Sequence, residues 1–442
     1  MKKTAAFKEL FIFALPIIFG HIGIMLVGTG DMIIAGRFSK ECLAAIGLAI
    51  SIANPIMMLG LGIQFAISPI LAQKRGKGEN VEQYFWSVML LSFIIGTVAS
   101  FATLLSVEIV PYFNYTPNLT KLIQEYLAIT SFSTLFICLY QGLKEFFQSQ
   151  ERTIAANVIA LVAVGVNLFF NYAFAFGEFG MPYLKEAGLA WASLSVRLFM
   201  GGTLFLMARH LWNKNKSISW SFIKEVWQLG VPITISIFFE VMAFCSVTLF
   251  VGKFSEDQIA ANNLALNVAS LAFMIPMSIA SAVGVKVGHA YGEKNYSLIK
   301  TFAQVSLMTS IGFTCLMASV FYFQSELVIS LFSTEADVVM WAKKLLFLVA
   351  CFQLFDGAQV TLVGILRGIS ITRPSSIAIF IGYWLIGIPL GYFLGFYRGF
   401  EAQGFWMGLA LSLALVAIML SVILKIKLKA LIHSQTSEFQ PN

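Results

Sequence analysis

The stretch Gly36-Arg37-Phe38-Ser39 returns later in the chain as Gly252-Lys253-Phe254-Ser255, and this repetition decides the fold. The same offset of 216 residues relates Phe7-Lys8-Glu9 to Ile223-Lys224-Glu225, Pro16 to Pro232, Ala44-Ala45 to Ala260-Ala261 and Gly76 to Gly292. A looser repetition, in which the offset drifts by a few residues, relates Arg152 to Arg373 and Asn171-Tyr172 to Gly391-Tyr392, and the offset is 216 again between Gly188 and Gly404. A chain that carries one pattern twice is expected to fold as two similar halves.

The composition is that of a protein embedded in a lipid bilayer. Of the 442 residues, 58% are hydrophobic and only 12% are charged, and the mean hydropathy is +0.83. Soluble domains carry about 25% charged residues, and a helix needs about 20 apolar residues to cross a bilayer. Twelve such runs are present, six in each copy of the repeat: 9–35, 43–72, 83–110, 121–147, 153–176, 187–211, 221–250, 259–286, 298–323, 338–366, 375–396 and 403–426.

The number of spans sets the relation between the halves. An even number in each copy returns the chain to the side on which it started, so both halves have the same orientation in the membrane. We therefore predict an all-α integral membrane protein with twelve transmembrane helices in two parallel six-helix bundles. The expected bundles are residues 1–212 and 221–427, with a cytoplasmic linker at 213–220 and a cytoplasmic tail at 428–442.

The basic residues indicate the orientation of the chain. The net charge is +7, with 29 Lys and Arg against 22 Asp and Glu. Most Lys and Arg residues, Lys74 and Lys144 among them, fall on the same side of the twelve spans as the two termini. Such an excess marks the cytoplasmic side, so both termini are expected in the cytoplasm. This distribution does not suit a nucleic-acid-binding protein.

Motifs for enzymatic chemistry are missing from the sequence. Neither HExxH nor GxSxG occurs, and the five cysteines include no CxxC pair. We predict that the protein is not an enzyme and needs no cofactor. The cysteines are expected to be buried free thiols: Cys42, Cys138, Cys245, Cys315 and Cys351.

Three acidic residues, Asp31, Glu240 and Asp356, lie inside predicted spans. A charged carboxylate in hydrocarbon costs roughly 2.5 to 3.5 kcal/mol, so each must face a partner, water or an ion, or be protonated. A single buried acid can be a packing residue satisfied by a neighbouring hydroxyl or amide. Three in one chain favour an ion-translocating function.

Amide side chains accompany these acids at helical spacing. Gln353, Asp356 and Gln359 are three residues apart along one span, and Asn263 and Asn267 are four apart on another. In the first half, Asn167 and Asn171 are also four apart, and Gly28 and Gly30 would let another helix approach Asp31. Carboxylate and amide oxygens suit sodium, whereas a proton needs only the carboxylate. Both ions therefore remain open.

Taken together, these segments resemble those of the multidrug and toxic compound extrusion (MATE) transporters, and the acids at Glu240 and Asp356 resemble the NorM-type branch. The resemblance covers nearly the whole chain. It is carried by the twelve spans in two halves and by Leu15-Pro16-Ile17, the Asp31 segment, Gly36-Arg37-Phe38, the element ending in Asn171-Tyr172, the Glu240 position and Gln353-Leu354-Phe355-Asp356-Gly357.

The resemblance implies antiport, in which sodium ions or protons enter while small organic cations leave and the bundles rock around a central cleft. It implies one cation site at Asp31, Asn167, Asn171 and Ser193 and another at Glu240 and Asp356. Family members often carry Thr where Ser193 stands, and proline where this chain has Leu168-Phe169-Phe170. Pro16 is the expected hinge, because a helix bent at proline can adopt two shapes. We expect a monomer in the bacterial inner membrane.

Other two-bundle carriers are the alternative function. A flippase for lipid-linked sugars would need several central basic residues to hold a pyrophosphate, and only Arg197 lies in mid-span by sequence. A major facilitator carrier should show an acidic and basic glycine-rich signature after the second span. The segment Gln73-Lys74-Arg75-Gly76-Lys77-Gly78 contains no acid.

Overall fold

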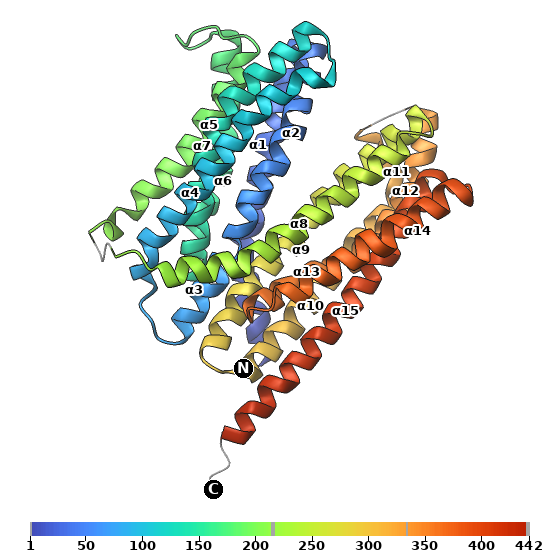
Figure 1. Cartoon of the computed structure of the whole chain (residues 1–442). Helices are drawn as coiled ribbons and strands as arrows, with labels where there is room; N and C mark the ends of the chain where they lie inside the picture. Colours follow the sequence, from blue (N-terminus) through green and yellow to red (C-terminus); the bar gives the residue numbers. More distant parts are fainter. Residues whose placement is uncertain (1, 214–216, 333–334, 439–442) are drawn as a thin grey trace. The chain divides into compact units, whose positions relative to one another are not determined.

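Helices account for all the regular structure in the part of the chain that the computed structural model describes, residues 2–213, 217–332 and 335–438. Twelve helical segments there are long and apolar enough to cross a membrane, which confirms the predicted fold class. The helices, drawn in Figure 1, are α1 (Lys3–Phe38), α2 (Lys40–Gln64), α3 (Ile67–Gly76), η1 (Val81–Tyr84), α4 (Phe85–Ser106), η2 (Val107–Phe113), α5 (Pro117–Ser149), α6 (Ile154–Phe176), α7 (Ala187–Met207), η3 (Ala208–Leu211), α8 (Trp220–Val251), α9 (Glu256–Gly292), α10 (Tyr296–Phe323), α11 (Ser325–Ser330), α12 (Ala336–Gly368), α13 (Arg373–Phe380), η4 (Ile381–Gly387), α14 (Ile388–Tyr392), η5 (Phe393–Tyr397) and α15 (Glu401–Glu438).

These helices form two compact units. The N-terminal unit is Leu15–Thr234, and the C-terminal unit is Met1–Ala14 together with Ile235–Asn442. The boundaries lie inside α1 and α8 and differ from the expected ones at the linker 213–220, of which residues 214–216 lie outside the described residues. Helix α15 continues through most of the expected tail, whose last residues, 439–442, are also outside them.

Helix α5 is central to the N-terminal unit. It packs against α2, α4 and α7, and α7 packs in turn against α6. The C-terminal half of α5 is buried on almost every side, as expected of a helix surrounded by others. Lys144, counted above with the cytoplasmic residues, belongs to this stretch and is only 2% exposed.

The C-terminal unit is built around α9 and α12. These two helices pack along much of their length, and α10 and α15 pack against α12. Gly364 of α12 permits the contact, because a Cβ at this position would collide with the backbone of Ala280 in α9. Beside α15, the span from Arg373 to Tyr397 is not a regular α-helix, since η4 and η5 are stretches of π-helix on either side of α14. Pro389 lies in α14, where it has no amide hydrogen to donate.

The first helix of each repeat, α1 or α8, begins in one unit and ends in the other. Equivalent ion pairs hold the first part of each helix. Glu9 of α1 pairs with Lys286 of the C-terminal unit at 2.6 Å, and Glu225 of α8 pairs with Lys74 of the N-terminal unit at 3.2 Å. Glu9 and Glu225 are themselves equivalent in the repeat. Each unit boundary lies within three residues of the proline of its helix, Pro16 in α1 and Pro232 in α8.

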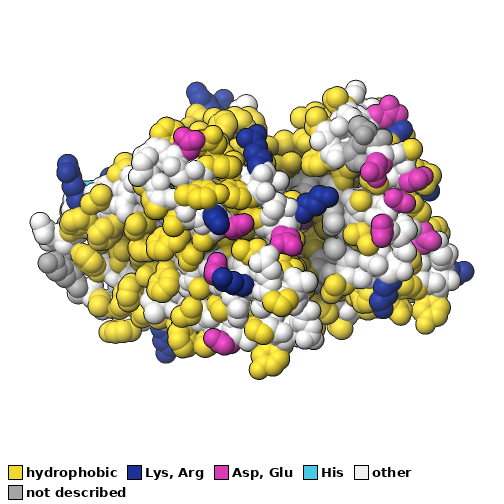
Figure 2. Space-filling model, turned by 90° about the horizontal axis from the view of Figure 1, so that it is seen from above, with side chains coloured by type: hydrophobic (Ala, Val, Ile, Leu, Met, Phe, Trp, Pro, Cys, Tyr) yellow, Lys and Arg dark blue, Asp and Glu magenta, His cyan; other side chains and the backbone are white. Residues whose placement is uncertain are grey.

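Large apolar side chains cover the outside of the helices. Figure 2 shows a face on which hydrophobic side chains are abundant and charged ones are interspersed. Residues such as Leu249 and Phe323 are 74% and 75% exposed, as expected for side chains that contact lipid. The cysteines are free, but Cys245 of α8 and Cys315 of α10 are exposed, and Cys351 of α12 is only partly buried. The expectation that all five are buried was therefore wrong.

Candidate cation-binding sites

Asp31 is the centre of a buried polar cluster in the N-terminal unit. The residue is 5% exposed, and its Oδ1 accepts hydrogen bonds from Asn167 Nδ2 at 2.8 Å and from Asn171 Nδ2 at 2.7 Å. Its Oδ2 accepts a hydrogen bond from the Ser193 hydroxyl at 2.7 Å. The structure thus brings together, from α1, α6 and α7, the residues that the resemblance implied for the first cation site.

Helix geometry explains why these side chains meet. Asn167 and Asn171 lie one turn apart on α6, and Asn171 Nδ2 also donates to Asn167 Oδ1 at 3.1 Å. Gly30 allows α6 to approach, because a Cβ there would lie 2.7 Å from Asn167 Oδ1. Gly28 has no such role, since a Cβ at that position would meet nothing within 4 Å. Of the two glycines expected to permit the approach, only Gly30 does so.

One oxygen of the cluster is available to a ligand. Asn171 is fully buried, and its Oδ1 has no hydrogen-bond partner. Leaving such an acceptor unsatisfied costs about 1 to 3 kcal/mol. A cation beside the Asp31 carboxylate would satisfy this oxygen, because hard cations bind carboxylate and amide oxygens together. The cluster can therefore hold a small cation, or a proton on Asp31.

Helix α5 supplies further polar groups that the sequence analysis did not single out. Arg197 of α7 donates from Nη1 to Ser133 Oγ at 2.8 Å and is within electrostatic reach of Asp31. Tyr126 is 7% exposed, within hydrogen-bonding reach of Ser193 and within electrostatic reach of Asp31. A signal was present, because the buried polar residues Tyr126, Thr130 and Ser133 follow one another at helical spacing.

A second cluster lies in the C-terminal unit and contains two carboxylates. Glu240 Oε1 of α8 accepts a hydrogen bond from the Tyr383 hydroxyl at 3.1 Å. Asp356 of α12 is 4% exposed and within electrostatic reach of both Glu240 and Tyr383. Two negative charges that interact in this way repel, and a cation or a proton relieves the repulsion. The two expected acids are therefore electrostatically coupled.

Tyr383 was missed by sequence reasoning, and its position depends on an unusual backbone. It lies in η4, one of the two π-helical stretches, and is fully buried. The neighbouring Trp384 fixes this segment to α8, because its Nε1 donates to the carbonyl of Phe239 at 3.0 Å. Such π-helical turns occur frequently at functional sites.

The four expected supporting amides differ in placement. Gln353 and Gln359 are buried beside Asp356 on α12, and each has a side-chain oxygen without a hydrogen-bond partner. Gln353 Nε2 donates to the carbonyl of Ala269 at 2.9 Å. Asn263 and Asn267 instead lie on the exposed side of α9, where Asn267 donates to the backbone of Asn263. Their neighbour Asn262 is buried and accepts a hydrogen bond from Trp406 Nε1 at 3.0 Å.

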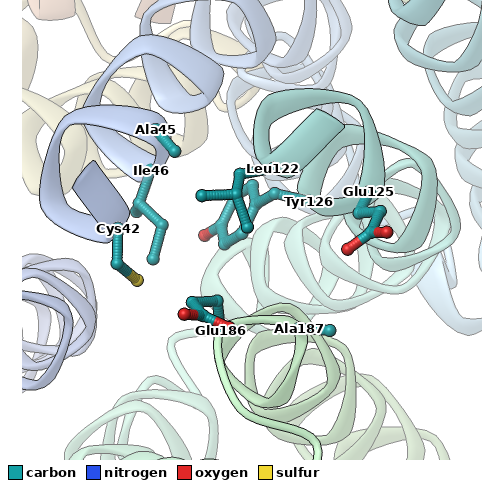
Figure 3. Close-up of a pocket in the computed structure, with 8 residues that line it drawn as sticks. All are labelled: Cys42, Ala45, Ile46, Leu122, Glu125, Tyr126, Glu186 and Ala187. Carbon is teal, nitrogen blue, oxygen red and sulfur yellow. The ribbon is translucent and has the colours of Figure 1, made fainter. Parts of the chain in front are cut away.

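A small pocket opens near the Asp31 cluster (Figure 3). It lies among the first turns of α2, the first part of α5 and the start of α7, and Tyr126 is one of its walls. Cys42 and Glu186 border it as well. Within the described residues, neither here nor in any other place does a group of three or more His, Cys, Asp or Glu side chains form that could hold a metal ion.

Comparison with known proteins identifies the family. The model of the MatE family matches residues 16–173 and 232–393, in both copies of the repeat. The multidrug resistance protein PmpM of Pseudomonas aeruginosa is 32% identical over 406 residues, which cover 89% of this chain and 84% of that protein. NorM of Aliivibrio fischeri, also a multidrug resistance protein, is 30% identical over 391 residues, 85% of this chain and 84% of its own. A crystal structure of the Vibrio cholerae MATE transporter VcmN matches at a TM-score of 0.86 with 16% identity, over 97% of this chain and 98% of that one. The chain belongs to the MATE family of transporters.

Proposed function

We propose that this transporter is a secondary active multidrug efflux protein that exchanges sodium ions or protons for organic, mostly cationic drugs by alternating access. The observation that carries the proposal is the pair of carboxylate clusters, one in each unit, in which Asp31 and Asp356 are buried. The names of the relatives, which describe multidrug resistance, support drugs as the substrate class. We place the protein in the bacterial inner membrane as a monomer, with both termini in the cytoplasm.

The Asp31 cluster supports binding of a coupling ion. Its three hydrogen-bond donors stabilise a charged Asp31 when no ion is bound. A sodium ion would recruit the free Asn171 Oδ1, and rotation of the Asn167 amide would add a second carbonyl oxygen. A proton would instead remove the charge that those donors hold. Either ion changes the contacts of α1, the helix that carries Asp31 and belongs to both units.

The Glu240 and Asp356 pair supports competition between the ion and the drug. An organic cation gains from the same negative charges as the coupling ion, so binding of one weakens binding of the other. This mutual weakening is what an exchanger needs, because each ligand then displaces the other. Gln353 and Gln359 offer unsatisfied amide oxygens beside this pair.

The membrane potential supplies the driving force in the proposed orientation. A potential of 100 mV favours inward movement of one positive charge by about 2.3 kcal/mol. Pro16 and Pro232 lie near the points at which α1 and α8 pass from one unit to the other. A bend at these prolines would let the units change their arrangement without unfolding a helix.

The test is efflux of a fluorescent organic cation from vesicles that contain the purified protein. Sodium and proton gradients are imposed separately, and we expect at least one of them to accelerate efflux by the wild type. Asp356→Asn and Glu240→Gln keep the size of each side chain but remove its charge. We expect both variants to lose gradient-driven efflux.

The matched control is Glu326→Gln, which removes a carboxylate that is 80% exposed in α11 and belongs to neither cluster. This variant should transport like the wild type. Insertion and folding are checked by intrinsic fluorescence of the eight tryptophans. Wild-type efflux in both Asp356→Asn and Glu240→Gln would overturn the coupling role of this pair.

A further inference from the structure

The internal repeat allows the pocket of Figure 3 to be compared with the equivalent place in the other unit. Ser39 caps α2 by accepting a hydrogen bond from the amide of Cys42 at 3.0 Å. Ser255 caps α9 in the same way, with the amide of Gln258 at 3.3 Å. These pairs are 216 residues apart, so Cys42 and Gln258 occupy the same position in equivalent helices.

The starts of α7 and α15 are equivalent too. A Cβ on Gly188 would meet the backbone of Phe174 and Ala175, and a Cβ on its counterpart Gly404 would meet that of Leu394 and Gly395. Each glycine therefore lets its helix touch the preceding span at the same height. By the same offset of 216 residues, Glu186 before α7 corresponds to Ala402 in α15.

In the C-terminal unit a glutamine fills the space between these elements. Gln258 is 3% exposed, and its Nε2 donates to Glu401 Oε2 at 2.6 Å. Its Oε1 accepts a hydrogen bond from the amide of Ala402 at 3.2 Å. The glutamine thus joins α9 to α15 and leaves both ends of its own amide satisfied.

In the N-terminal unit the shorter Cys42 leaves this space open. In Figure 3 the Cys42 sulfur and the Glu186 carboxylate face one another across the pocket, and the Tyr126 hydroxyl points into it. Glu125 also borders the pocket, but its carboxylate turns away and pairs with Lys121 at 3.8 Å. One carboxylate, one thiol and one phenol therefore face the open space, and the rest of its lining is apolar, from Ala45, Ile46, Leu122 and Ala187.

The wall formed by Tyr126 leads directly to the Asp31 cluster. Tyr126 is within hydrogen-bonding reach of Ser193, which donates to Asp31 at 2.7 Å. Tyr126 and Ser193 therefore connect the pocket to the Asp31 carboxylate. A small cation could be passed along these oxygens without entering a purely apolar region.

We propose that this pocket is the vestibule through which a monovalent cation passes between the aqueous phase and Asp31. Glu186 attracts the cation at the mouth, and Tyr126 guides it into the cluster. The C-terminal unit has no route at the equivalent position because Gln258 closes it. The proposal rests on the function proposed above for Asp31, and in the orientation given there the vestibule faces the outside.

The test measures how efflux from vesicles depends on the external sodium concentration, with a second arm in which external pH is varied without sodium. Glu186→Gln removes the attracting charge, and we expect the concentration for half-maximal efflux to rise roughly tenfold, with the maximal rate kept. Cys42→Gln introduces the side chain that closes the other unit, so we expect the maximal rate to fall as well. The arm that shows these changes identifies the ion.

Two matched controls share the chemistry of these variants. Glu125→Gln removes a carboxylate that turns away from the pocket, and Gln258→Cys is the reverse exchange in the other unit. Both should keep the wild-type ion dependence. If Glu186→Gln and Cys42→Gln keep the wild-type ion dependence while Asp31→Asn is inactive, the proposed vestibule is wrong and the role of Asp31 stands. Ion-driven efflux by Asp31→Asn at the wild-type rate would instead overturn the proposed role of Asp31.

Discussion

At the scale of single residues, the two clusters hold their carboxylates by different means. Asp31 accepts hydrogen bonds from two amides and a hydroxyl, whereas Glu240 has a phenol and a second carboxylate nearby. The sequence identified the acids, because any carboxylate inside an apolar span stands out. It did not identify Tyr126 or Tyr383. Tyrosine is common in membrane spans, and the spacing of residues along one helix does not reveal which other helix they face.

The placement of the asparagines on α9 shows the same limit. Asn262, Asn263 and Asn267 are polar residues in one apolar span, and only Asn262 is buried. Successive residues on a helix point about 100° apart, so a shift of one position changes which side chain faces the interior. The spacing of four residues indicated that Asn263 and Asn267 share one face of the helix. It could not decide whether that face points into the protein or outward.

We expect Tyr383→Phe to weaken ion coupling without unfolding the protein. The change removes only the hydroxyl that donates to Glu240. A hydrogen bond to a charged group contributes about 1.5 to 3 kcal/mol, so the ion dependence of efflux should shift by roughly tenfold or more. The measurement is efflux at a series of sodium concentrations and pH values. An unchanged dependence on both ions would exclude a contribution of Tyr383 to the site.

A pair of glycine variants tests the packing around Asp31. Gly30→Ala places a Cβ 2.7 Å from Asn167 Oδ1, and we expect a loss of stability of about 1 to 3 kcal/mol. Gly28→Ala meets nothing within 4 Å and should be neutral or slightly stabilising. Thermal unfolding in detergent compares the two. Equal effects at both positions would contradict the close approach of α6 at Gly30.

At the scale of helices, the apolar runs in the sequence predicted the membrane spans but not the breaks and π-helical turns within them. The run 43–72 contains the junction between α2 and α3, and the run 375–396 contains π-helical turns. Hydrophobic periodicity is too coarse to reveal either, because each changes the backbone over only a few residues. The sequence also did not reveal that α1 and α8 each belong to both units. A repeat shows which segments are equivalent, but not against which segments they pack.

We expect Pro16→Ala to slow efflux while leaving the Asp31 cluster able to bind its ion. Alanine restores an amide hydrogen and favours a straight α1 at the boundary between the units. The control is Pro55→Ala in α2, a helix that lies wholly within the N-terminal unit. Efflux rate and ion-dependent thermal stabilisation are measured for both variants. A Pro16→Ala protein with the wild-type efflux rate would remove the hinge from the mechanism.

At the scale of the whole molecule, the two copies of the repeat have a similar architecture but carry their acidic residues at different positions. In the repeat frame Asp31 stands opposite Val247, and Glu240 stands opposite Ile24. Val247 is buried and apolar, so the C-terminal unit has no copy of the Asp31 site at that position. The fold was predictable because composition and repetition act over the whole chain. The sites depend on a few contacts between distant helices, which no repeat specifies.

The most direct test of the account is to record drug exit and ion entry in the same vesicles. An outwardly directed gradient of a fluorescent organic cation is imposed, and internal sodium and pH are followed with separate dyes. We expect drug exit to drive sodium or protons inward in the wild type, and we expect Asp31→Asn and Asp356→Asn to abolish this linked movement. Drug exit without inward movement of either ion, or linked movement that survives both substitutions, would contradict this expectation.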